Sequence, residues 1–372
     1  MNNNSISNSQ GTCQPHLNVA FMKIHKCGSS LISQMLLRFG YEHNLIVALP
    51  SRPGYSIIGG VGGIKDGDYV HPPGGKRWNI FVHHAFYNRT RFRQLMAPDT
   101  RYVAILREPL DRLKSAFQYF HLEKTFPGLK QKTRRRNAYV TTYLSRPSYW
   151  DPLYRDKTSF HACARNCMSR DLGLAERHYD NRTAVQEFVR GIENDFQTVL
   201  ILEHLPASLV LLKRRMCWTF RDILYTSAGN ARVQKYRRKA RITDTMKRAF
   251  YQHNYADALL YNRFKESLQK QIRQEGPDFQ EEVNHFTRVN HDVDSYCRSA
   301  KRQQGGNLVV EKSRWNEAFS LNKLFCARYA QVRRYWEKLL RSRYGLPRKK
   351  SSRKSRRKRR RSKAMSSYMS KT

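Results

Sequence analysis

The chain has 372 residues, of which 40% are hydrophobic and 12% aromatic, so it can form one large domain or two smaller ones with a sizeable core. Its formal net charge is +41, and removing the twelve lysines and arginines of RKKSSRKSRRKRRRSK, residues 348–363, leaves +29. This composition excludes an intrinsically disordered chain and favours anionic partners: nucleic acid, acidic glycan, anionic membrane or an anionic cofactor.

The first residues and the cysteines narrow the class further. MNNNSISNSQGT is polar and unlike a signal peptide, and no run of about 18 apolar residues predicts a transmembrane helix. Seven cysteines show no CxxC pair and no zinc-like spacing, so we expect no metal site. The odd count fits either some disulfides with one free thiol or a reduced chain. Sequons at Asn3, Asn88 and Asn181 are compatible with the secretory pathway.

In chain order, apolar strand patterns alternate with helical patterns. Residues 51–75 hold eight glycines and three prolines and predict a long loop, and the last third is helical. The alternation predicts an α/β fold with a mostly parallel sheet flanked by helices. We expect a flexible lead-in over residues 1–16, one folded domain over 17–345 and a disordered basic tail over 346–372. The predicted strands are 17–24, 78–86, 101–108 and 197–204, and the predicted helices 31–40, 110–120 after Pro109, and 207–218.

The first motif, KIHKCGSS, lies between a predicted strand and a predicted helix. Ligands of such sheets bind beyond the carboxyl ends of the strands, and Gly28 lets the backbone approach a ligand closely. The N–H groups of residues 29–31 and the helix dipole would attract an anion, and the hydroxyls of Ser29 and Ser30 would add donors. With the charges of Lys23 and Lys26, the motif predicts a phosphate-binding loop. It is not a Walker A loop, because the lysine precedes the glycine.

The second motif, AILREPLDRLKSAF, places Arg107 at a strand end and Ser115 about two helical turns further on. This pair could hold a second phosphate. The alternative is a structural ion pair of Arg107 with Glu108 or Asp111.

The third motif is the pair His83-His84 in a predicted strand. Adjacent strand residues point to opposite faces, so one histidine at most can face a binding cleft. A histidine beside an anion site is the usual choice for a general base. Burial as a structural group is the other interpretation.

Taken in order, these motifs resemble the galactose-3-O-sulfotransferase family of Golgi sulfotransferases. The resemblance is carried by CQPHLNVAFMKIHKCGSSLISQMLLRFG, HHAF, YVAILREPLDRLKSAFQYF, RNCMSRDLG and LVLLKRRMCWTFRDILY. It spans residues 13–225 and, less clearly, reaches about residue 340. It implies a P-loop-like sulfotransferase fold and a Golgi location.

The resemblance implies 3′-phosphoadenosine 5′-phosphosulfate as the donor and no metal. Its 5′-phosphosulfate would bind the first motif, through Lys23, His25, Lys26, Gly28, Ser29 and Ser30, and its 3′-phosphate would bind Arg107 and Ser115. Lys26, with Lys23, would stabilise the leaving group, and His84 would be the general base. His25 remains the rival base, or a donor to the sulfuryl oxygens.

The implied acceptor is the 3-hydroxyl of galactose on a glycolipid or glycoprotein, with sugar-stacking aromatic residues among Tyr119, Phe120, Tyr149, Trp150 and Tyr154. Alternatives are another glycan acceptor or, in a different class, a nucleic-acid or polyanion-binding protein that uses KTRRR (132–136) and the tail. We expect no obligatory nucleic acid, and polyanion contact through the tail remains open.

The sequence also departs from the family. Family members carry an N-terminal membrane anchor, so we expect a fragment, an alternative start or a soluble relative. Cys27 stands where a small or hydroxyl residue is usual.

Overall fold

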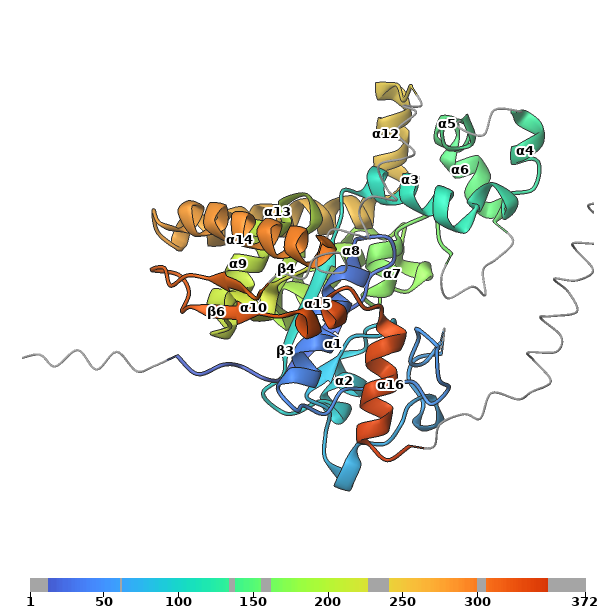
Figure 1. The fold of residues 1–372 in the computed structure, drawn as a ribbon. Coiled ribbons are helices and arrows are strands. Elements are labelled where there is room, and N and C mark those ends of the chain that lie inside the picture. Colours follow the sequence, from blue (N-terminus) through green and yellow to red (C-terminus); the bar gives the residue numbers. More distant parts are fainter. Residues whose placement is uncertain are drawn as a thin grey trace, which may run out of the picture.

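The computed structural model describes residues 13–60, 62–133, 138–154, 162–226, 241–299 and 306–346. At its centre is a sheet of four parallel strands in the order β2-β1-β3-β4 (Figure 1). The strands are almost wholly buried, as expected of a parallel sheet with both faces covered. These strands are β1 (Val19–Met22), β2 (Ile80–Phe81), β3 (Arg101–Leu106) and β4 (Phe196–Ile201), and β5 (Leu308–Val310) pairs with β6 (Phe319–Leu321) in a separate antiparallel ribbon.

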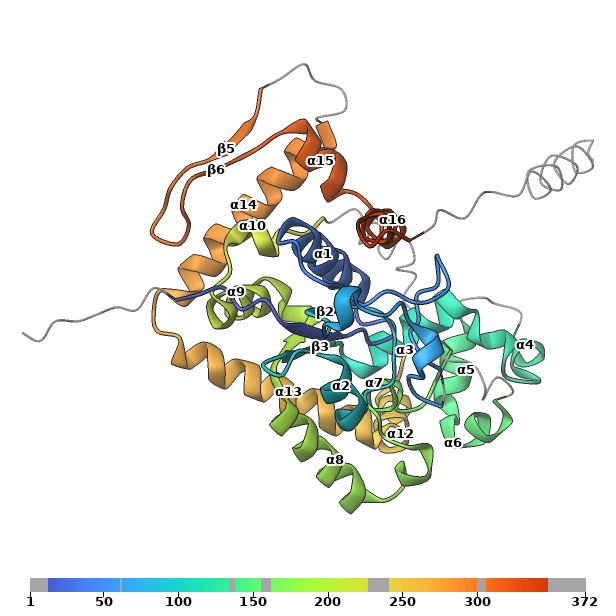
Figure 2. The same ribbon diagram turned by 90° about the horizontal axis from the view of Figure 1, so that it is seen from below.

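Helices cover both faces of the sheet and confirm the predicted α/β class. Figure 2 shows α1 and α16 on one side of the sheet and α8 and α13 on the other. The helices are α1 (Ser29–Glu42), α2 (Arg89–Leu95), α3 (Pro109–Phe120), α4 (Leu129–Lys132), α5 (Tyr139–Ser145), α6 (Pro147–Trp150), α7 (Cys167–Asp171), α8 (Arg182–Asp195), α9 (Leu205–Met216), α10 (Phe220–Ile223), α12 (Asp244–His253), α13 (Tyr255–Gln274), α14 (Phe279–Ser299), α15 (Lys323–Tyr329) and α16 (Arg333–Arg343).

The predicted elements are found close to their expected positions, with one large difference. The segment 78–86 was predicted as one strand, but β2 holds only Ile80 and Phe81. Beyond β2 the chain leaves β1 and pairs with the glycine-rich segment instead. The His84 N–H donates to the carbonyl of Ser56 (2.9 Å), and the Ile58 N–H donates to the carbonyl of His84 (2.9 Å). The long glycine-rich loop therefore flanks His84.

Helix α3 follows directly from its sequence. Pro109 occupies the first helical position, as predicted, and Glu108 is the N-cap. The Glu108 carboxylate accepts from the N–H groups of Leu110 (2.9 Å) and Asp111 (2.8 Å). The apolar face of α3 packs into a second cluster of buried residues, formed with α4, α5, α6 and α12, at one end of the molecule.

The structure has three disulfides, Cys13–Cys217, Cys163–Cys167 and Cys297–Cys326, of which the first joins residues 204 apart and the second residues four apart. Cys27 is a buried free thiol. Of the two cysteine patterns left open by the count, the structure has disulfides with one free thiol. Cys13 belongs to the predicted lead-in 1–16, whose described end, residues 13–16, is thus anchored to α9. Residues 1–12, the basic tail from residue 347 and most of KTRRR lie outside the described residues.

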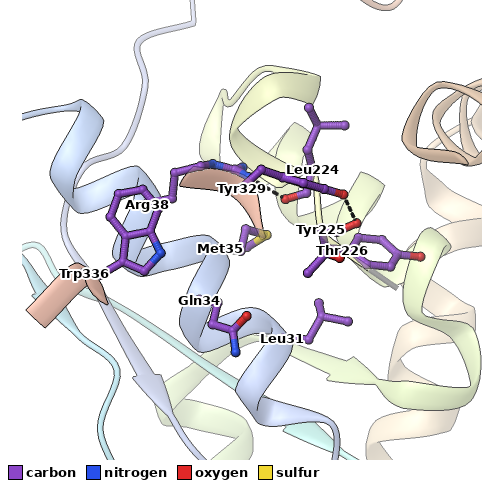
Figure 3. A pocket seen from close by; sticks show the side chains of 9 residues that line it. All are labelled: Leu31, Gln34, Met35, Arg38, Leu224, Tyr225, Thr226, Tyr329 and Trp336. Carbon is purple, nitrogen blue, oxygen red and sulfur yellow. Dashed lines mark hydrogen bonds between the residues drawn. The ribbon is translucent and has the colours of Figure 1, made fainter. Parts of the chain in front are cut away.

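A buried arginine on α1 holds α10 and the residue that follows it. The Arg38 guanidinium donates to the carbonyls of Leu224 (3.0 Å), Arg221 (2.8 Å) and Asp222 (2.8 Å). Figure 3 shows it beside a cavity between α1, α16 and residues 224–226. The cavity has a volume of about 10 Å³, barely room for one water, so it is too small for a nucleotide.

We expect Arg38→Leu to lower the free energy of unfolding by about 2–4 kcal/mol, because it leaves three buried carbonyls without their charged donor. Arg190→Leu is the matched control, since Arg190 is exposed on α8. It should change stability by less than about 0.5 kcal/mol. Urea denaturation followed by circular dichroism measures both variants. Equal midpoints for the two variants would contradict the structural role of Arg38.

Candidate active site

The loop of residues 23–28 joins β1 to α1 at the carboxyl edge of the sheet. Two of its residues are left-handed, Lys26 with φ 67° and Gly28 with φ 74°. The left-handed backbone at Gly28 favours glycine, and a Cβ there would also lie 2.6 Å from Cδ1 of Leu202, which would have to shift. A left-handed lysine costs about 1 kcal/mol or more, and such strain is concentrated at functional sites.

The mouth of α1 offers fewer donors than its sequence predicts. The Ser29 hydroxyl donates inward to the carbonyl of Ile24 (2.6 Å), and the Leu31 N–H donates to the carbonyl of Gly28 (3.0 Å). Ser30 is exposed at the helix start. The helix has no acidic residue in its first turn, so nothing there opposes an anion.

Both lysines of the loop have lowered pKa values. Burial, and then the nearby Arg333, lower the pKa of Lys23 to about 8, although Glu337 acts against the shift. Burial and then Arg107 lower the pKa of Lys26 to about 8. The Lys26 ammonium lies over the ring of Tyr119, 3.6 Å from the centroid. The loop thus holds two cations whose charge would be stabilised by an added anion.

The side chains of His83 and His84 lie in different surroundings, as their adjacent positions in an extended segment predict. His83 is fully buried, and its Nε2 lies 2.8 Å from Oε1 of Glu337 on α16. His84 is half-buried, and its Nδ1 donates to the carbonyl of Lys23 (2.6 Å). Because a carbonyl can only accept, this bond places the proton on Nδ1 and the acceptor lone pair on Nε2.

His25 stacks directly on His84, with ring centroids 3.9 Å apart and planes within 10°. A buried carboxylate holds it there: Oδ2 of Asp171 accepts from the His25 ring Nδ1 (2.7 Å) and from its backbone N–H (2.8 Å). Burial raises the pKa of Asp171, but His25 and Arg170 together lower it below its ordinary value. Asp171 therefore fixes both the loop and the ring of His25.

Arg107 follows β3 and reaches toward the same loop. Its Nη1 donates to the carbonyl of Lys26 (3.3 Å). The two carboxylates suggested as its structural partners bond elsewhere: Glu108 caps α3 and accepts from Tyr251 (2.6 Å), and Asp111 pairs with Lys114 (2.9 Å). Ser115 is half-buried on α3, about two turns from its start. Its pairing with Arg107 around a phosphate stays a prediction.

The aromatic residues expected near the acceptor divide into two groups. Trp150 is buried and donates from Nε1 to the carbonyl of Thr142 (3.0 Å), and Tyr154 packs against Phe126. These two belong to the second hydrophobic cluster. Tyr119 is 68% exposed and lies beside the loop, where its ring meets Lys26.

Cys27 is fully buried, and burial raises the pKa of its thiol well above the ordinary value. The thiol is therefore protonated and packed in the core, in accord with a simple substitution at this loop position. Among the described residues, no group of three His, Cys, Asp or Glu side chains is arranged to hold a metal ion.

Sequence reasoning missed Asp171, Glu337 and Arg333. Asp171 lies in RNCMSRDLG, a segment important to the family resemblance, but its distance of 146 residues from His25 hid the contact. Glu337 and Arg333 lie on α16, in the part of the chain where the resemblance fades. No local pattern distinguishes them from other charges of an amphipathic helix.

A family model described as galactose-3-O-sulfotransferase matches residues 3–314. The chain belongs to this family. Galactose-3-O-sulfotransferase 3 of Mus musculus is 32% identical over 263 residues, which cover 70% of this chain and 58% of the relative. Galactosylceramide sulfotransferase of Bos taurus is 28% identical over 349 residues, 88% of this chain and 77% of the relative. Galactose-3-O-sulfotransferase 2 of Homo sapiens is 31% identical over 298 residues, 79% of this chain and 70% of the relative.

The chain thus spans little more than half the length of the mouse relative. No helix among the described residues is long and apolar enough to cross a membrane. In this chain Arg107 bonds to the loop that carries Lys23, His25 and Lys26, and His84 stacks on His25.

Proposed function

We propose that this chain transfers a sulfuryl group from 3′-phosphoadenosine 5′-phosphosulfate to the 3-hydroxyl of a galactose on a glycolipid or glycoprotein glycan. The observation that carries the proposal is the position of His84, whose Nδ1 donates to the carbonyl of Lys23 at the mouth of a cationic loop. The related proteins are named for galactose and for galactosylceramide, so galactose is the shared acceptor sugar.

The residues of the loop fit the anionic donor. Lys23 and Lys26 after β1 and Arg107 after the neighbouring strand β3 supply three cations, and the start of α1 supplies backbone N–H groups. We propose that Lys23, His25, Lys26, Gly28, Ser29 and Ser30 hold the 5′-phosphosulfate, with Ser29 acting through its backbone. Arg107 and Ser115 would hold the 3′-phosphate.

The donor supplies the sulfuryl group, and the side chains move the proton and balance the charge. Nε2 of His84 takes the proton of the sugar hydroxyl as that oxygen bonds to sulfur. The bond from sulfur to the bridging oxygen breaks, and the ammonium of Lys26, with that of Lys23, stabilises the charge on the departing phosphate. His25, held by Asp171, keeps His84 in place through the ring stack. No metal ion is needed for these steps.

The three disulfides support a site of action in an oxidising compartment. We propose the Golgi lumen, in keeping with the resemblance to Golgi sulfotransferases.

The first test is a calorimetric titration of 3′-phosphoadenosine 5′-phosphate, the expected product nucleotide, into the full chain, with ATP as control. Binding that discriminates against ATP supports the donor site. Acceptor assays then compare β-galactosides with polysaccharides that contain uronic acid or hexosamine. Folded protein that does not bind the nucleotide would exclude the proposed donor.

The affinity for this nucleotide should fall as the pH rises through about 8, because both lysines have a pKa of about 8 in the free protein. The bound anion favours the charged lysines and so raises their pKa. Well below pH 8 both lysines are already charged, and affinity is constant. Well above pH 8 each lysine must take up a proton, so affinity drops about tenfold per pH unit for each lysine.

Titrations at pH 7, 8 and 9 in two buffers of different ionisation enthalpy would measure both the affinity and the protons taken up. An affinity that stays constant to pH 9, without proton uptake, would contradict the lowered pKa values.

A further inference from the structure

Tyr119 is the most exposed large hydrophobic side chain of the described residues, at 68%. It stands on the last turn of α3 with its ring edge-on to Phe120, at 5.0 Å between centroids and an interplanar angle of 90°. Phe120 in turn lies 6.4 Å from the ring of His25, which stacks on His84. A short series of rings therefore connects Tyr119 to the proposed base.

Lys26, which the proposed donor site needs, covers a face of the Tyr119 ring. The Lys26 ammonium lies 3.6 Å from the ring centroid, a cation–π contact, and 5.9 Å from that of Phe120. The proposed chemistry requires this ammonium at the phosphosulfate. An ammonium that moves toward the leaving group moves away from this ring face.

We propose that the Tyr119 ring binds the apolar face of the acceptor galactose, and that Lys26 covers this ring until the donor draws the ammonium away. Donor binding then uncovers the acceptor platform, so the donor adds first. The inference rests on the proposed function and extends it to the acceptor subsite and to the order of binding.

The chemistry of the platform suits a hexose. A β-galactose presents several C–H groups on one face, and a tyrosine ring offers a flat, polarisable surface of similar size. The other exposed rings are paired with arginines: Tyr149 is stacked with Arg146, 5.1 Å from its ring centroid, and Tyr55, in the loop that flanks His84, with Arg52 at 5.7 Å. Neither of these two contacts involves a residue of the proposed site.

The test measures lactose binding by NMR titration, with and without saturating 3′-phosphoadenosine 5′-phosphate. In the unmodified chain the nucleotide should tighten lactose binding about three- to tenfold, the gain from uncovering the ring. In Lys26→Ala the ring is open from the start, so lactose should bind without nucleotide about as tightly as it binds the nucleotide-loaded unmodified chain.

Steady-state kinetics test the ring itself. Tyr119→Ala should raise the KM for lactose about tenfold with little loss of kcat, and Tyr119→Phe should restore the KM. Nucleotide affinity should rise in Tyr119→Ala, because Lys26 no longer has to leave the ring. Leu324→Ala, at an exposed large side chain on α15, is the control and should leave the KM unchanged.

The outcomes separate the two proposals. Nucleotide that binds while lactose affinity stays the same overturns the coupling alone. Loss of nucleotide affinity in Tyr119→Ala would mean that the ring belongs to the donor, and it overturns the acceptor platform. Failure of the unmodified chain to bind nucleotide overturns the proposed function, and this inference falls with it.

Discussion

Replacing His84 by alanine is expected to lower kcat about 100- to 10,000-fold, while the affinity for 3′-phosphoadenosine 5′-phosphate changes by no more than about twofold. The acceptor hydroxyl is a very weak acid, so a base must take its proton as the oxygen attacks sulfur. His84 presents its lone pair at Nε2 because Nδ1 donates to the carbonyl of Lys23 (2.6 Å). The product nucleotide offers no proton to a base, so its binding should be nearly indifferent to the loss.

The stacked partner makes this a comparison of two histidines. His25 lies 3.9 Å from His84, and its Nδ1 is bonded to Asp171, so it could itself accept a proton at Nε2. His25→Ala should weaken nucleotide binding as well as turnover, because the loop loses the ring bond to Asp171 and keeps only the backbone bond. His291→Ala, at an exposed position on α14, is the matched control.

Added imidazole offers a further check, because a base in solution can partly replace a missing one. Recovery of turnover in His84→Ala but not in His25→Ala would support His84. Near-normal turnover of His84→Ala, or rescue confined to His25→Ala, would assign the base to His25.

Much of the sheet could be predicted because its strands are short apolar runs bounded by residues that mark the ends of strands and the starts of helices. β1 and β3 read directly from VAFM and RYVAIL, and Pro109 marks the start of α3. The strand over 78–86 was overestimated, since apolar alternation does not reveal which neighbour an extended segment pairs with. After Phe81 the chain pairs with residues 56–58, which the glycine content had identified only as a long loop.

The candidate site was predictable where residues adjacent in sequence act together. The loop of residues 23–28 and the opposite orientation of His83 and His84 follow from local geometry. The partners of those residues do not. Asp171 and Glu337 reach His25 and His83 from 146 and 254 residues away, and only the fold brings them together.

The direction in which the Ser29 hydroxyl donates could not be predicted from the sequence either. A serine at a helix start can donate outward to a ligand or inward to a carbonyl, and the sequence is the same in both cases. Ser29 donates inward to Ile24 (2.6 Å), because the tight turn at Gly28 brings that carbonyl within reach.

Lys26→Ala should lower kcat about 100- to 1,000-fold, with a weaker effect on the affinity for the product nucleotide. The charge on the bridging oxygen grows only as the bond to sulfur breaks, so the ammonium contributes most in the transition state. Ground-state binding keeps the cations of Lys23 and Arg107. Lys26→Arg should not restore the rate. The left-handed backbone at residue 26 fixes the direction of the side chain, and a broad planar guanidinium cannot take the position of the compact lysine ammonium.

Arg107→Ala should affect nucleotide binding more than turnover. This contrast with Lys26→Ala tests whether Lys26 acts mainly in the transition state. The 3′-phosphate keeps its charge throughout the reaction, so loss of Arg107 should raise the Kd of the nucleotide and the donor KM more than it lowers kcat. Lys270→Ala, an exposed change on α13, controls for the loss of one positive charge. If Lys26→Ala instead raised the donor KM and left kcat intact, Lys26 would be a binding residue. The charge on the leaving group would then have to be balanced by Lys23, the other buried cation of the loop.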